Sequence, residues 1–177
     1  AMGQVMSLVR NILIARWIGP AEFGLAATFV VMTSLIDLVS DLAIDKLLIQ
    51  ANDGDDPSLQ SNAQLLQALR GAVAAGAILL IAGPMAALFD APNALSAYRW
   101  LALFPLIRGF AHLDMVRAQR QLRFAPSILV DVGSQAASLA IAWPLAMWLG
   151  DHRVALGVIL AQAVAFVVGS HLVAGRP

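Results

Sequence analysis

Charged residues interrupt long apolar runs along the whole of this chain, and these runs limit what it can fold into. The chain has 177 residues, of which 60% are hydrophobic and 12% are charged. Soluble domains are about half apolar and about a quarter charged, so the composition indicates a membrane protein. A charge at the centre of a bilayer costs about 2.5 kcal/mol or more, so it usually faces a bundle interior or a wet cavity. The residues in this position are Arg10, Asp37, Asp41, Arg70, Arg108, Asp114 and Asp131.

The apolar runs are separated by short stretches of turn residues, among them Gly19-Pro20 and Gly150-Asp151-His152. A helix that crosses a bilayer needs about 20 mostly apolar residues. The sequence therefore predicts one all-α transmembrane helix bundle over residues 1–177. The expected spans are 2–18, 21–49, 62–89, 96–119, 124–149 and 153–173.

Basic residues predict the orientation of the bundle, because short cytoplasmic loops are enriched in Lys and Arg. One side of the expected topology holds Lys46, Arg117, Arg120, Arg123 and Arg176. The other side holds only Arg16, Arg99 and Arg153. We therefore expect a multi-pass protein with the connections at 46–62 and 117–123, and both termini, in the cytoplasm.

Several ligand classes find no support in the sequence. The formal net charge is zero, which argues against a basic nucleic acid-binding surface. The chain has no Cys, so disulfides and thiolate metal sites are excluded. Its histidines, His112, His152 and His171, fall on different expected elements. We therefore expect no metal, no other cofactor and no nucleic acid partner.

Helix geometry separates the intramembrane charges by depth, since a helix rises about 1.5 Å per residue. The group near the middle of the membrane contains Arg10, Asp37 and Arg108. The group in the cytoplasmic half contains Asp41, Arg70, Asp114 and Asp131. We expect substrate contact in the middle group, and pairing or gating in the other.

Polar residues also recur on single helical faces, at spacings of three or four residues. This pattern predicts a hydrophilic cavity lined by the first, second, fourth and fifth spans. Its expected lining residues are Ser7, Asn11, His112, Asp131, Ser134 and Gln135. The sixth span has little polar character beyond Gln162 and Ser170, so it is expected to face lipid or to serve packing. In the third span, Gly71, Gly76 and Gly83 are expected to be close-packing positions.

The intramembrane arginines have two interpretations. A guanidinium group stays charged and binds phosphate oxygens through two hydrogen bonds, which makes Arg10, Arg108 and, lower down, Arg70 candidate substrate-binding residues. Asp37 and Asp41 would then orient them, or carry a coupling proton or sodium ion. Alternatively, the arginines only neutralise buried carboxylates, and Arg70 extends to the membrane surface.

Three further arginines, Arg117, Arg120 and Arg123, have a similar pair of interpretations. They either meet an anionic headgroup at a cytoplasmic entrance or serve as the positive-inside anchor.

Near the opposite side, Gly19-Pro20 is expected to end the first helix. Glu22 then falls in the first turn of the second helix, where a carboxylate complements the helix dipole.

Two segments carry a resemblance to a known family. Residues 15–24 read A-R-W-I-G-P-A-E-F-G, followed by D-L-A at 41–43 and L-I-Q at 48–50. This resembles the A-R-x-L-G-P-x-E-F-G, D-L-G and L-I-Q pattern of bacterial polysaccharide and lipid-linked oligosaccharide flippases. These belong to the multidrug/oligosaccharidyl-lipid/polysaccharide exporter superfamily. Residues 119–124, Q-R-Q-L-R-F, are similar to the turn between the fourth and fifth helices of that family. Ala43 departs from the pattern, which often has Gly there.

The resemblance implies a non-enzymatic transporter in the bacterial inner membrane. It would flip a polyprenyl-pyrophosphate-linked oligosaccharide or polysaccharide precursor by alternating access, with the lipid tail left among the membrane lipids. Members of the family have two lobes. This chain corresponds to the N-terminal lobe, so a C-terminal lobe is an expected partner.

Three other function classes remain open at this point. A cation-coupled multidrug antiporter of the same superfamily would need carboxylates for its cationic substrate, and the mid-span arginines argue against it. A polyprenyl-phosphate sugar transferase or polymerase would need catalytic residues in sizeable loops, and the loops here are short. A passive assembly subunit would not depend on Arg10 or Arg108.

Overall fold

The computed structural model describes residues 2–40 and 57–174, and every regular element in that part of the chain is helical. The predicted all-α bundle is confirmed. The second half of the second expected span, with Asp41, lies outside the described residues. The elements are α1 (Met2–Ile18), α2 (Pro20–Ser40), α4 (Pro57–Leu88), the 3-10 turn η1 (Pro92–Ala94), α5 (Leu95–Trp100), α6 (Leu103–Arg108), α7 (Asp114–Arg120), α8 (Ala125–Leu149) and α9 (Arg153–Val173).

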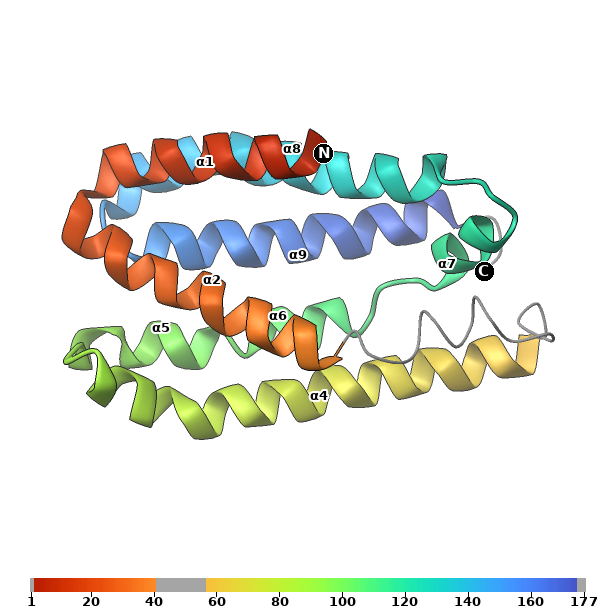
Figure 1. Cartoon of the computed structure of the whole chain (residues 1–177), viewed down its shortest axis with the longest axis horizontal. Coiled ribbons are helices and arrows are strands. Elements are labelled where there is room, and N and C mark those ends of the chain that lie inside the picture. Colours follow the sequence, from red (N-terminus) through yellow and green to blue (C-terminus); the bar gives the residue numbers. More distant parts are fainter. Residues whose placement is uncertain (1, 41–56, 175–177) are drawn as a thin grey trace.

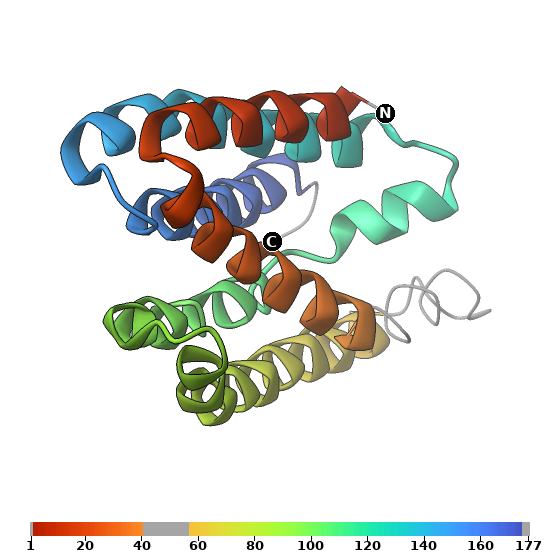
Figure 2. The same ribbon diagram turned by 60° about the vertical axis from the view of Figure 1, so that its left-hand side comes forward.

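The helices form two groups (Figure 1). Helix α2 lies between them, and α9 belongs to one group and contacts the other. In one group α1 and α9 both pack along α8. In the other, α5 and α6 lie along α4. Helix α9 also packs against α6, and α2 runs diagonally from the end of α1 towards α4, as Figure 2 shows from the side. The bundle is thus held together through α9.

The connections alternate between two ends of the bundle. The turn from α1 to α2, the turn from α8 to α9, and η1 lie at the left of Figure 1. Helix α7, the start of α4 and the end of α9 lie at the right. Successive long segments of the chain thus run in opposite directions along the bundle.

The turn between α1 and α2 forms for the predicted reason. Gly19 adopts a left-handed conformation, with φ of 82°, which glycine tolerates without steric cost. Pro20 then begins α2, where its missing amide hydrogen is not needed. The amide of Phe23 donates to the carbonyl of Gly19 at 3.0 Å and closes the first turn of α2.

The fourth expected span, 96–119, is divided into α5, α6 and α7. Pro105 has no amide hydrogen to donate to Leu101, and the Leu101 carbonyl instead accepts from the amide of Phe104 at 3.0 Å. The first interruption therefore lies at residues 101–102. The second lies at residues 109–113, between α6 and α7.

Side chains from two other helices satisfy the backbone at this second break. The amide group of Gln64 donates to the carbonyl of Ala111 at 3.0 Å, and that of Gln67 donates to the same carbonyl at 3.3 Å. On the other side, the backbone amide of His112 donates to Ser170 Oγ at 2.9 Å. Non-helical backbone inside a membrane protein is tolerated where protein groups satisfy it in this way.

Two glycines allow α4 and α6 to approach closely. A Cβ atom on Gly71 would lie 2.6 Å from the carbonyl oxygen of Pro105, and one on Gly109 would lie 3.2 Å from the carbonyl oxygen of Gln67. The prediction for Gly71 is confirmed. The predictions for Gly76 and Gly83 are wrong, because a Cβ there would have no neighbour within 4 Å.

An aromatic cluster joins α2, α5 and the start of α9. The ring of Phe29 meets that of Tyr98 edge-on, with centroids 5.1 Å apart, and contacts that of His152 at 6.1 Å. The Tyr98 hydroxyl and Thr28 Oγ1 are hydrogen-bonded at 2.6 Å. Phe29 and Tyr98 are fully buried, so this cluster is the centre of the apolar core at this end.

The outer surface has the character expected in lipid. Large apolar side chains are widely exposed, for example Leu80, Trp148 and Leu172, each at 80% or more. Three described helices are long and apolar enough to cross a membrane: Asn62–Leu88, Ala125–Leu149 and Arg153–Val173. Pro20–Ile36 is a shorter apolar helix. The chain is therefore a membrane protein.

The contact between α4 and α6 gives a first prediction. Gly71→Ala should lower the thermal unfolding midpoint in detergent, because overpacking of a filled contact costs about 1–3 kcal/mol. Gly76→Ala is the matched control on the same helix. It should leave the midpoint unchanged or raise it, since Ala is favoured over Gly in a helix by about 1 kcal/mol. Both midpoints can be measured by circular dichroism. Equal midpoints for the two variants would contradict the proposed contact.

Candidate functional site

Helix α9 presents one polar or aromatic side chain per turn towards the candidate site. These are Gln162, Phe166 and Ser170, which are four residues apart and so lie along one side of the helix. Gln162 contacts Arg10, and Phe166 contacts Arg108. The two mid-membrane arginines predicted from the sequence are therefore held at consecutive turns of α9.

Arg10 is buried where α1, α8 and α9 meet, with 7% of its surface exposed. Its Nη1 donates to Ser138 Oγ at 2.8 Å, to Gln162 Oε1 at 2.5 Å and to Gln135 Oε1 at 3.3 Å. Its Nη2 donates to Ser7 Oγ at 3.2 Å. All four acceptors are neutral, so they bind the guanidinium group without cancelling its charge.

No carboxylate pairs with Arg10 in the part of the chain that the structure describes. Its Nε is buried and makes no hydrogen bond. Among the described carboxylates, including that of Asp131, none makes the buried pair with Arg10 that the alternative interpretation requires.

Arg108, at the end of α6, is held differently. Its guanidinium carbon lies 3.9 Å from the centre of the Phe166 ring, a cation–π contact. Among the described carboxylate side chains, which do not include that of Asp37, none forms an ion pair with this guanidinium group. Like Arg10, Arg108 has no counter-ion among them.

A cavity of about 100 Å³ lies beside Arg108, between α4, α6 and α9. Arg70 and His112 line it as well, so the structure brings together three of the predicted site residues. Gln67 and Phe166 are further lining residues that the sequence did not suggest.

Other predicted cavity residues line a separate, open hollow between α1 and α8. Its volume is about 440 Å³, and its walls include Ser7, Asn11, Asp131 and Gln135. Ser134 is buried and donates instead to the backbone carbonyl of Asp131 at 2.9 Å. The described residues of the predicted cavity therefore line two spaces, one beside Arg108 and one between α1 and α8.

The three arginines of the expected cytoplasmic entrance lie on or after α7. Arg117 pairs with Asp114 at 3.3 Å, and Arg123 is exposed. The side chains of Arg120 and Asp37, like the whole of Asp41, lie outside the described residues. No group of three or more acidic or His side chains among the described residues is placed to hold a metal ion.

Residues 13–177 match the model of a family described as polysaccharide biosynthesis protein. The chain belongs to this family. The assignment confirms the resemblance to the multidrug/oligosaccharidyl-lipid/polysaccharide exporter superfamily. Comparisons with curated proteins and with solved structures gave no match.

The match includes Arg70, Arg108 and His112 but begins after Arg10. Membership in the polysaccharide biosynthesis protein family therefore bears on the cavity beside Arg108. The interpretation of Arg10 depends on the structure alone.

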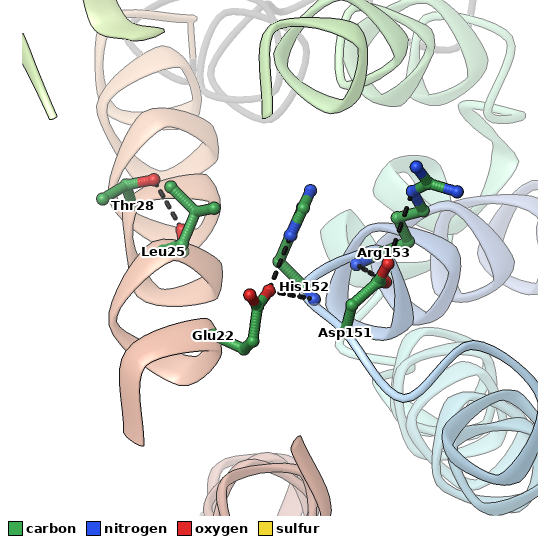
Figure 3. Close-up of polar contacts among 6 residues, drawn as sticks. All are labelled: Glu22, Leu25, Thr28, Asp151, His152 and Arg153. Carbon is green, nitrogen blue, oxygen red and sulfur yellow. Dashed lines mark hydrogen bonds and ion pairs between the residues drawn. The ribbon is translucent and has the colours of Figure 1, made fainter. Parts of the chain in front are cut away.

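The family motif at residues 15–24 contains Glu22, whose role is visible in Figure 3. Glu22 Oε2 accepts a hydrogen bond from the backbone amide of His152 at 2.9 Å and lies 2.7 Å from His152 Nδ1. His152 precedes the first residue of α9, so the carboxylate meets the positive end of that helix. Glu22 thus fixes the turn between α8 and α9 against α2.

The sequence prediction for α9 was incomplete. This helix was expected to face lipid or to serve packing; it packs along α8, and it also contacts Arg10, Arg108 and His112. The four-residue spacing of Gln162, Phe166 and Ser170 was the available signal. It was weak because Phe166 is apolar and does not stand out in an apolar helix.

The Glu22 contact gives a second prediction. Glu22→Ala should lower the unfolding midpoint, because a charge-assisted hydrogen bond is lost and the backbone amide of His152, just before α9, loses its acceptor. His152→Ala should do the same. In a double-mutant cycle the two changes should be non-additive by about 1 kcal/mol, whereas Glu22→Ala and Arg99→Ala, at an exposed site, should add. Strict additivity of the first pair in chemical unfolding would show that the contact does not contribute.

Proposed function

We propose that this chain forms the N-terminal lobe of a flippase for a lipid-linked oligosaccharide or polysaccharide precursor. Its family is one of polysaccharide biosynthesis, and its helices are those of a membrane protein. A hydrophilic headgroup on a polyprenyl carrier needs a transporter to cross the bilayer, and family membership fits this role better than catalysis.

One observation carries the proposal: two buried or half-buried guanidinium groups, Arg10 and Arg108, have no carboxylate partner among the described residues. An uncompensated charge inside a membrane protein is costly and usually marks a substrate path. Arginine stays protonated and matches phosphate oxygens with its planar donors. A pyrophosphate-linked headgroup supplies the anion that these two residues lack.

The proposed mechanism is alternating access. The end of the bundle that carries Arg117 and Arg123 would face the cytoplasm of the bacterial inner membrane and receive the headgroup. Rocking against a C-terminal lobe would then expose the headgroup to the other side, while the lipid tail remains in the bilayer. The open hollow beside α1 is a surface on which the two lobes could enclose the headgroup.

A cation-coupled multidrug antiporter is the second candidate, and one observation favours it. Asp131 is exposed on the open hollow between α1 and α8, and a carboxylate there could hold a cationic substrate. The flippase is preferred because the uncompensated buried charge is positive. The flippase requires Arg10 and not Asp131, whereas the antiporter requires Asp131 and not Arg10.

The test is translocation of a fluorescent lipid-linked oligosaccharide in vesicles that contain the whole transporter. Arg10→Gln and Arg108→Gln should each slow translocation about tenfold or more, because a hydrogen bond to a charged group contributes about 1.5–3 kcal/mol. Arg16→Gln, at an exposed arginine on the same helix as Arg10, is the matched control and should keep the original rate.

The same vesicles decide between the two candidates. Unchanged translocation in both Arg10→Gln and Arg108→Gln would overturn the proposal. Uptake of a cationic dye that is lost in Asp131→Asn and retained in the two arginine variants would instead establish the antiporter. Normal assembly, measured by size-exclusion chromatography, shows that each variant is folded.

A further inference from the structure

A third space, a groove of about 430 Å³, lies between α5 and the first two turns of α9. Helix α9 contributes Arg153, Leu156 and Leu160, which lie on one face of that helix. Helix α5 contributes Ser96 and Trp100. The groove shares no lining residue with the cavity beside Arg108 or with the hollow between α1 and α8.

The groove is polar at one end and apolar further in. Helix α9 begins at Arg153, and Leu156 and Leu160 follow about 4.5 and 10.5 Å further along its axis. On α5, Ser96 lies in the first turn and Trp100 comes one turn later. We call the polar end, at Arg153 and Ser96, the mouth of the groove. Polar groups followed by apolar ones along both helices match a lipid, in which an acyl chain follows a headgroup.

Exposed tryptophans mark this end of the bundle as a membrane–water interface. Trp17 lies near the end of α1, Trp100 on α5 and Trp148 near the end of α8, and all three side chains are exposed. Trp is enriched at the depth of the lipid headgroups. Trp100 also lines the groove, so the mouth lies near the headgroups and the apolar part lies among the acyl chains.

Two opposite charges lie at the mouth (Figure 3). Arg153 Nε lies 3.5 Å from Asp151 Oδ2, and the two side chains are 58% and 33% exposed. Asp151 Oδ1 also accepts a hydrogen bond from the backbone amide of Arg153 at 2.8 Å. This amide and that of His152 both have protein acceptors, so the accessible charges are those of the side chains. The pair offers one guanidinium and one carboxylate, with no net charge.

We propose that this groove binds a phospholipid with a zwitterionic, primary-amine headgroup, that is, phosphatidylethanolamine. Its phosphate would accept from Arg153, and its ammonium group would donate to Asp151. One acyl chain would lie against Trp100, Leu156 and Leu160. A headgroup without an amine would give the Asp151 carboxylate no cation, and a trimethylated amine would have no N–H to donate to it.

This proposal goes beyond the transport of a polysaccharide precursor. The groove is at the opposite end of the bundle from α7 with its arginines, and it contains neither Arg10 nor Arg108. A phospholipid between α5 and α9 would connect the two groups of helices. It would do so whether or not the chain moves a lipid-linked sugar.

The test measures the binding of three phospholipids with identical acyl chains to the purified protein in detergent, by native mass spectrometry. These are phosphatidylethanolamine, phosphatidylcholine, whose amine is trimethylated, and phosphatidylglycerol, which has no amine. Phosphatidylethanolamine should bind about fivefold more tightly than either of the others, the size expected for one favourable exposed ion pair.

Four variants assign the binding to this groove. Arg153→Gln should weaken the binding of all three lipids, because each contains the phosphate. Asp151→Asn keeps an oxygen for the backbone amide of Arg153 but removes the charge, so the affinity ratios should fall close to one. Ser96→Trp fills the mouth and should weaken all binding with both charges in place. Arg16→Gln, at an exposed arginine at the same end of the bundle, is the matched control and should change nothing.

The outcomes that would overturn the proposal are specific. They are equal affinity for the three lipids, tighter binding of phosphatidylglycerol, and unchanged affinity ratios in Asp151→Asn. A photoreactive phenylalanine analogue at position 96 that cross-links only to a second copy of the chain, or only to a C-terminal lobe, would also overturn it. Should a variant fail to fold, the ratios for the original protein still decide.

The lipid proposal and the transport proposal can fail independently. Arg10→Gln should slow translocation and leave the lipid affinity ratios intact.

Discussion

The rest of the structure depends on how an arginine is kept inside an apolar bundle. Arg10 is surrounded by side-chain oxygens from α1, α8 and α9, and these contacts fix the three helices relative to one another. Burial of a cation without a counter-ion costs free energy, and a well-packed bundle could form without such a residue. Neutral acceptors reduce that cost while leaving the charge, so the same contacts can hold the bundle together and attract an anion.

Helix α9 connects the contacts of Arg10 to the rest of the bundle. It packs along α8, contacts α6 and receives α2 at its beginning through Glu22 and His152. The helix that connects the polar sites thereby has a single Lys, Arg, Asp or Glu residue, Arg153, at its first position. Its apolar character is a requirement of its central position, because an additional charge there would need a partner of its own.

The sequence was sufficient for the helical class and for the turn at Gly19. Each of these depends on local chemistry or on helix periodicity. The division of the fourth span was not predicted, although Pro105 is visible in the sequence, because the second break at 109–113 is stabilised by Gln64, Gln67 and Ser170 from distant segments. The spacing of residues within one helix cannot predict contacts of this kind between distant segments.

The break at 109–113 has a consequence for how the protein is made. Its backbone amide at His112 is satisfied by Ser170 on α9, which is synthesised nearly 60 residues later. Until α9 leaves the ribosome, the segment after α6 lacks one of the groups that make it tolerable in hydrocarbon. The segment must then wait near the insertion machinery or at the water interface. Membrane integration of this region is therefore completed only after α9 has been translated, and not in the order in which the helices emerge.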